Sequence, residues 1–232
     1  MKGKTLIILS LLLTLVACSP SQNQVESSMK ESGSSPQVRP PNVEQNTFDS
    51  EKVENKVEPV NEEGKTSFRN VKWGMSKEQI MSLEKAELVT EENDSLVYKD
   101  NINGIDSAVF YNFIDNELTY GGYFITETHS NEMEYINDFN VLKAELKNKY
   151  GEPISDEQIW KKDRYKNTPE KWGMAILLGE LELMAKWDTP DTEIIIRLAG
   201  DNYQPAFGIA YKSKELFQKA QEREKEQTKS KF

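Results

Sequence analysis

Residues 181–211 read LELMAKWDTPDTEIIIRLAGDNYQPAFGIAY, and this stretch decides the fold class. It contains three apolar runs rich in β-branched and aromatic residues, which favour strands. We predict strands over residues 181–187, 192–198 and 206–211. The turn sequences Thr189-Pro190-Asp191 and Gly200-Asp201-Asn202 separate the runs. Because such short turns join neighbouring strands in opposite directions, the stretch predicts an antiparallel meander.

A second meander is expected upstream. We predict its strands over residues 96–99, 105–113 and 118–126. Asn103-Gly104 joins the first two, and this dipeptide readily adopts the two positive φ angles of a tight hairpin turn. A second turn is expected at Asp115-Asn116. Gly121-Gly122 in the third strand predicts either a bulge or the close approach of another backbone.

Four helices are expected around these strands. Ser76 and Gln79 have the spacing of a capping box, which begins the first helix. Asn131 begins the second, whose apolar side recurs at helical spacing and is expected to lie on a sheet. That side consists of Ile136, Phe139, Leu142, Leu146 and Tyr150. A short helix is expected after Thr168, and Ser213 is expected to cap the last one.

With a further strand expected at residues 158–161, the order predicts an α+β fold in which helices pack on antiparallel β-meanders. The order also fits two tandem helix-plus-sheet units, because each meander follows a helix that could cover it. We therefore predict an α+β domain at residues 67–217, with sub-units at about 67–130 and 131–217, and a polar helical or frayed tail at 218–232.

The N-terminus has the zones of a signal peptide over residues 1–17. Lys2 and Lys4 precede an apolar run from Leu6 to Val16, and the small residue Ala17 follows it. The run is about half the roughly 20 residues that a helix needs to cross the hydrocarbon core. Cleavage is therefore expected rather than a permanent transmembrane anchor.

The end of this run, Leu15-Val16-Ala17-Cys18, resembles a bacterial lipobox. The resemblance implies that the thiol of Cys18 receives a diacylglyceryl group and that cleavage leaves Cys18 as the first residue. An ordinary secretory signal followed by a chance cysteine is the alternative. Against it, Cys18 is the only cysteine of the chain and has no internal disulfide partner. We expect a palmitate-type lipid anchor that holds the protein on the extracytoplasmic face of the cell membrane.

Residues 18–66 are predicted to be the lipidated cysteine and a disordered linker, because Ser, Gln, Asn, Glu and Pro dominate and Phe48 is the one aromatic residue. As a flexible coil the linker would span about 35 to 40 Å. Removal of residues 1–17 takes away two lysines and no acids, so the formal charge changes from -10 to -12. Such an acidic chain repels phosphate backbones, which argues against nucleic acid as a partner.

A lipobox, a linker and helix-plus-meander units together resemble the superfamily of secreted β-lactamase-inhibitor proteins and the small lipoprotein of the outer-membrane barrel assembly machinery. The stretches Phe68–Ser76 and Lys149–Pro153 also resemble uncharacterised lipoproteins of Gram-positive bacteria. The inhibitor members contain two such units in tandem. The resemblance implies that the protein recognises another protein through its sheet and catalyses no reaction. It does not identify any binding residue in this chain.

The candidate site residues are few. His129 is the only histidine and is expected to be a solvated loop residue, so neither a catalytic constellation nor a metal or cofactor site is predicted. Tyr120 and Tyr123 are the speculative binding surface, because a regular strand points them to opposite faces and could expose one. We expect the side chains of Trp160, Trp172 and Trp187 to pack in the core.

The function predicted from these observations is a lipid-anchored, non-enzymatic binding module that recognises an extracytoplasmic protein or envelope component. One alternative is a hydrolase of cell-wall glycan or peptide, which would use a pair of carboxylates in a concave cleft. The other is a structural or small-ligand accessory lipoprotein, which would contain an apolar pocket.

Overall fold

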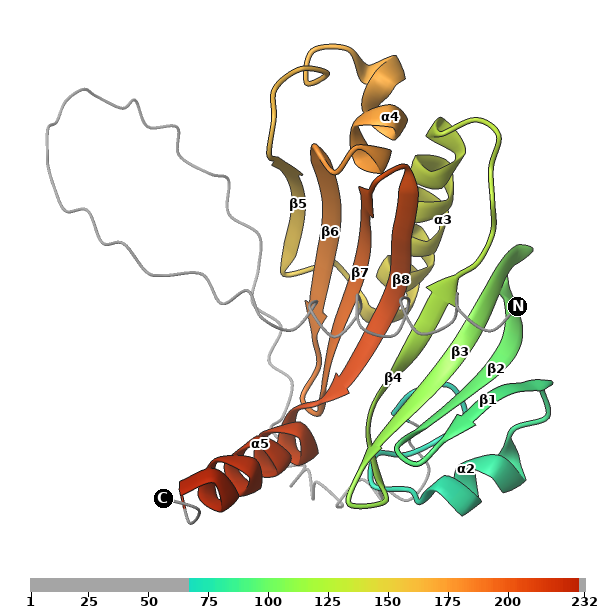
Figure 1. The fold of residues 1–232 in the computed structure, drawn as a ribbon, viewed down its shortest axis with the longest axis vertical. Coiled ribbons are helices and arrows are strands. Elements are labelled where there is room, and N and C mark those ends of the chain that lie inside the picture. The colour runs from blue at the N-terminus through green and yellow to red at the C-terminus, as the bar shows by residue number, and fades with distance from the viewer. Residues whose placement is uncertain (1–66, 230–232) are drawn as a thin grey trace, which may run out of the picture. The chain divides into compact units, whose positions relative to one another are not determined.

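The computed structural model describes the backbone of residues 67–229 and the side chains of residues 67–223. The predicted signal peptide, the lipidated Cys18 and the predicted linker lie outside the described residues. Over the described part, the chain forms one antiparallel sheet with three of its helices packed on one face, which confirms the predicted α+β class (Figure 1).

The sheet has eight strands in the order β1-β2-β3-β4-β8-β7-β6-β5. The strands are β1 (Leu88–Glu92), β2 (Ser95–Ile102), β3 (Ile105–Ile114), β4 (Glu117–Ile125), β5 (Ser155–Trp160), β6 (Leu181–Asp188), β7 (Thr192–Asp201) and β8 (Gln204–Ser213). The two predicted halves each contribute a four-stranded meander. They are joined by antiparallel pairing of β4 with β8, in which Gly122 lies opposite Ala210.

Tight turns connect the strands as their sequences require. Asn103 and Gly104 have φ angles of 51° and 86°, and Asp115-Asn116 forms a second turn with two positive φ angles. Both turns confirm the prediction. The turn between β7 and β8 was predicted at Gly200-Asp201-Asn202 and lies slightly later, because the two positive φ angles belong to Asn202 and Tyr203. Strand β1 was not predicted, since most of its side chains are exposed and show no apolar alternation.

Helix α2 (Lys77–Leu83) begins with the predicted capping box between Ser76 and Gln79. Helix α3 (Met133–Tyr150) begins two residues after Asn131, although the Asn131 Oδ1 still accepts a hydrogen bond from the Met133 N–H at 3.1 Å. The short helix consists of a 3₁₀ turn η2 (Pro169–Lys171) and α4 (Trp172–Leu177). Helix α5 (Lys214–Lys229) starts at Ser213, whose Oγ accepts from the Leu216 N–H at 3.2 Å.

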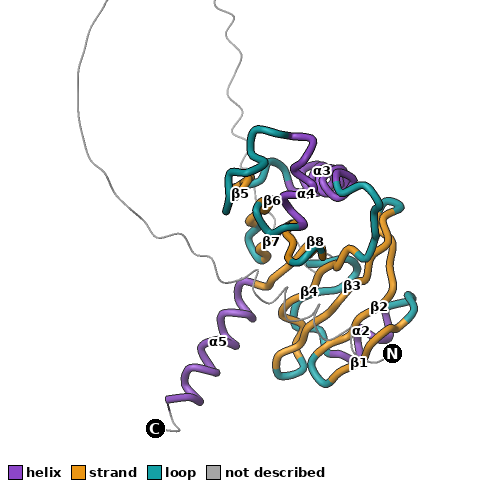
Figure 2. The backbone as a smooth tube through the Cα atoms, turned by 45° about the horizontal axis from the view of Figure 1, so that its top comes forward, coloured by secondary structure: helices purple, strands orange, loops and turns teal. Residues whose placement is uncertain are grey.

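Helices α2, α3 and α4 all contribute side chains to the main core on one face of the sheet. In Figure 1, α3 lies behind β7 and β8, and Figure 2 shows α5 leading away from the sheet. The predicted apolar side of α3 is confirmed, with four of its five residues buried and Tyr150 packed at the margin. Trp187 is also core, and its Nε1 donates to the Gly151 carbonyl at 2.8 Å.

The glycine pair in β4 marks a close approach, as predicted. A Cβ on Gly121 would lie 3.0 Å from the Phe68 ring, and one on Gly122 would lie 2.0 Å from the Ile209 carbonyl oxygen. The irregular register of β4 lies instead between Leu118 and Tyr120.

Within residues 67–229, no helix combines the length and the apolar character that a membrane span needs.

Candidate binding surfaces

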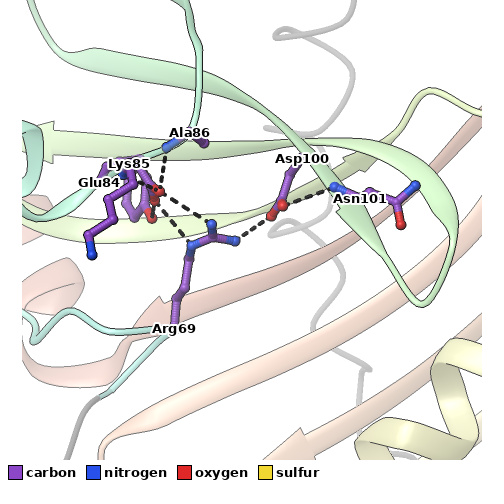
Figure 3. A network of polar contacts seen from close by, with 7 residues as sticks. Arg69, Glu84, Lys85, Ala86, Asp100 and Asn101 are labelled. Carbon is purple, nitrogen blue, oxygen red and sulfur yellow. Dashed lines mark hydrogen bonds and ion pairs between the residues drawn. The ribbon is translucent and has the colours of Figure 1, made fainter.

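Arg69 is the centre of a polar network at the start of the described chain (Figure 3). Its Nε lies 3.1 Å from Glu84 Oε2, its Nη2 donates to Glu84 Oε1 at 3.3 Å, and its Nη1 pairs with Asp100. Arg69 has a φ of 54°, a left-handed conformation that is uncommon outside glycine. The two carboxylates therefore hold a strained turn against β2 and the end of α2.

Tyrosines extend this network into the core. The Tyr111 hydroxyl donates to Glu84 Oε2 at 2.7 Å. Burial disfavours the charged form of Glu84, but this hydrogen bond, the N–H groups of Ala86 and Lys85, and the charge of Arg69 outweigh it and lower its pKa. Burial and the bond to Glu84 raise the pKa of Tyr111 far above its usual range.

A cleft of about 370 Å³ lies between α3 and the sheet, next to this network. It is lined by Ile102, Tyr123, Leu142, Glu145, Leu146, Asn148, Lys149, Ile209 and Tyr211. Two of the lining tyrosines pack on the same buried ring, since the centroids of Tyr123 and Tyr211 lie 5.5 and 4.6 Å from that of Phe68. Glu145 is the only carboxylate among the residues that line the cleft. The cleft therefore does not supply the carboxylate pair that a glycosidase needs.

The opposite face of the sheet carries a second apolar cluster. It consists of Phe110, Tyr120, Phe124 and Ala210, with Val97 packed against it. The Phe110 and Phe124 rings stack with centroids 4.4 Å apart, and Tyr120 lies 5.4 Å from Phe110. All members lie on strands β2, β3, β4 and β8, and no residue of α2, α3 or α4 belongs to the cluster. We call this side of the sheet the strand face.

Charged residues continue the strand face across β6, β7 and β8. Glu193 pairs with Lys186 at 3.1 Å and with Lys212 at 2.5 Å. Arg197 donates twice to Glu182, through Nε at 2.5 Å and Nη2 at 2.9 Å. Because strand neighbours share a face, these pairs lie beside the aromatic cluster and form its polar border.

The structure separates the two tyrosines of the speculative binding surface. Tyr120 lies in the strand-face cluster and is only 5 % exposed, and its hydroxyl has no hydrogen-bond partner among the described residues. Burial raises the pKa of Tyr120 well above its usual range. Tyr123 points to the helix face, where its ring contacts Phe68 at 5.5 Å. The alternation of faces is as predicted, and both side chains are largely packed.

His129 differs from the expected solvated loop residue. Its Nε2 lies 2.6 Å from Asp138 Oδ2 on α3, and its ring meets the Tyr135 ring edge-on at 4.8 Å. The His129 N–H also donates to the Tyr135 hydroxyl at 3.2 Å. His129 therefore holds the β4–α3 connection against α3 through these contacts. The sequence contained no signal for this contact, because Asp138 is nine residues away and its side-chain direction depends on where the helix begins.

Trp160 and Trp172 pack edge-on, with ring centroids 5.8 Å apart at the margin of the main core. Within residues 67–223, no three acidic, histidine or cysteine side chains are grouped as metal ligands would be. No protein-family model, curated protein or solved structure matches the chain significantly. The resemblances drawn from the sequence remain expectations.

Proposed function

We propose that this protein is a lipid-anchored, extracytoplasmic, non-enzymatic binding module that recognises a protein partner through the strand face. The observation that supports this proposal best is the composition of the second cluster, which is apolar, aromatic and built only from strand residues. Its four buried members are at most 6 % exposed, so a partner would contact the half-buried side chains beside them, such as Val97. Helices α2, α3 and α4 all pack on the other side.

The strand face has the composition of a protein interface. Such interfaces combine an aromatic, apolar centre with a polar rim that remains hydrated. Here the half-buried Val97 packs against the stacked rings, and the half-buried Ala108 lies opposite Phe124 in the strand register. Met184, also half-buried, lies farther along the same face on β6, and the Glu193 and Glu182 ion pairs border the face. Because the rings already pack on one another, the surface is ordered before binding and loses little side-chain entropy.

Photo-crosslinking in intact cells tests this assignment. A photoreactive amino acid replaces Val97 or Met184 on the strand face and, as a matched control, Val141, which is exposed on α3. We expect a discrete adduct with one protein from the two strand-face positions and none from Val141. Equal adducts from all three positions, or none from the strand face, would contradict the proposed surface.

The anchor is tested separately. Metabolic labelling with a fatty acid should label the wild-type protein and leave the Cys18→Ala variant unlabelled, and the variant should leave the membrane fraction. Equal labelling of the two chains would refute lipidation at Cys18 while leaving the crosslinking result intact.

A small-ligand accessory role is the second candidate, and the cleft beside Tyr123 favours it. Its volume of about 370 Å³ is within the range of small-molecule sites. Native mass spectrometry of the protein purified from its own cells should then show a bound small molecule. An Ile102→Trp substitution at the cleft wall should remove that molecule, and a wild-type protein without any bound mass would reject this candidate.

A further inference from the structure

A basic segment at one end of the sheet contrasts with the acidic chain. Residues 161–171, which we call the basic loop, contain two acids and five bases: Lys161, Lys162, Arg164, Lys166 and Lys171. The loop therefore carries a formal charge of +3, whereas the whole chain carries -10. It follows the edge strand β5 and leads into α4 (Figure 1).

The basic side chains of this loop are directed to solvent. The side chains of Lys161, Lys162, Arg164 and Lys166 are between 51 % and 66 % exposed. The carboxylates that pair with Lys161, Lys162 and Arg164 lie underneath, because Glu180 is only 3 % exposed and Glu182 only 10 %. Lys166 instead pairs at 3.2 Å with Asp163, which is 80 % exposed. Apart from Asp163, the charge that an approaching surface meets first in these pairs is positive.

The loop is also ordered without a ligand. Arg164 pairs with Glu180 at 3.0 Å, and the Lys161 N–H donates to the Glu180 carbonyl at 2.8 Å. Trp172 Nε1 donates to the Lys166 carbonyl at 3.2 Å. The cations of Arg164 and Lys171 lie 5.5 and 5.7 Å from the centre of the Tyr165 ring. Binding would then cost little backbone entropy.

We infer that the basic loop docks the domain on the anionic phospholipid headgroups of the membrane to which the protein is tethered. The inference rests on the proposed lipid anchor, which would keep the loop within a linker's span of one anionic surface and raise its effective concentration there. Basic residues near such a surface each contribute to binding. Glu180 and Glu182 lie within 4 Å of the loop cations and offset part of their charge. Acids farther than about 8 to 10 Å are screened and weaken the attraction little.

The test measures vesicle binding by the mature chain, residues 18–232, with Cys18→Ser so that no acyl chain contributes. Vesicles of phosphatidylcholine with phosphatidylglycerol are compared with vesicles of phosphatidylcholine alone. A loop variant, Lys162→Gln with Lys166→Gln and Lys171→Gln, leaves the Arg164–Glu180 pair intact. The matched control removes the same charge from exposed lysines elsewhere, namely Lys85, Lys147 and Lys219.

We expect the wild type to bind only the anionic vesicles and to be released by salt. At about fivefold per basic residue, the loop variant should bind about 100-fold more weakly, and the control should bind nearly as the wild type does. Absence of binding to anionic vesicles, or an equal loss in the two variants, would overturn the inference. Binding to soluble polyphosphate but not to vesicles would also overturn it and assign the loop to an anionic polymer. Because this chain has no anchor, failure here is distinguishable from failure of lipidation at Cys18.

Discussion

Gly122→Ala should destabilise the domain at the pairing that joins its two halves. The added Cβ would lie 2.0 Å from the Ile209 carbonyl oxygen, whereas ordinary contact begins at 3.4 Å, and 2.9 Å from the Phe110 ring. Relief requires β8 to move away from β4 by more than 1 Å. Overpacking of this kind costs about 1 to 3 kcal/mol. Each ladder hydrogen bond stretched beyond its normal length adds about 1 kcal/mol.

We therefore expect a loss of about 3 to 4 kcal/mol in the free energy of unfolding, measured by urea titration and followed by circular dichroism. For a domain of this size that corresponds to a fall in Tm of roughly 6 to 16 °C. Gly104→Ala is the control, because a Cβ there meets nothing within 4 Å and only the φ of 86° is unfavourable. It should cost about 1 kcal/mol. A Gly122→Ala protein no less stable than the Gly104→Ala protein would refute the steric argument.

Four further predictions concern the core and the polar network. Arg69→Met should lower the free energy of unfolding by about 2 kcal/mol, because it leaves Glu84 without its counterion; urea titration showing no change would contradict this. The folded state lowers the pKa of Glu84, so the ionised carboxylate stabilises the fold above the usual pKa of 4.5, and this stabilisation is lost as the pH falls below that value. In Arg69→Met, the fall of Tm on the acid side of a Tm–pH curve should therefore be shallower. Conversely, the folded state raises the pKa of Tyr111, so stability should fall as the pH rises above its usual 10.0, and Tyr111→Phe should reduce that alkaline loss. Trp187→Phe should cost about 1 to 2 kcal/mol in the same urea assay, because the Gly151 carbonyl loses its donor; an unchanged midpoint would show that this bond contributes nothing.

Features with a local physical cause were predictable from the sequence. The capping box at Ser76 and the positive φ angles at Asn103-Gly104 depend on residues within one turn of the chain, and both are present. The apolar side of α3 was predictable from its period. Strand β1 was missed because a largely exposed edge strand has little apolar pattern.

The candidate surfaces were only partly accessible from the sequence. Alternation along β4 was enough to place Tyr120 and Tyr123 on opposite faces, and the structure agrees. The Arg69 network was not predictable, because Glu84 and Asp100 are 15 and 31 residues away from the arginine. The basic loop could have been found from composition, since it contains the densest group of lysine and arginine residues in residues 67–223.

By itself, the sequence determined the α+β class, most of the strands and helices, and the residues that α3 buries, because turn chemistry, caps and periodicity act over a few residues. Only the tertiary structure decided that the two meanders form one sheet through β4 and β8. It also decided which face the helices leave uncovered and where the cleft lies. These features depend on pairings between segments roughly 90 residues apart, for example Tyr123 with Ile209. No local preference specifies such pairings, and they form only when the whole core packs at once.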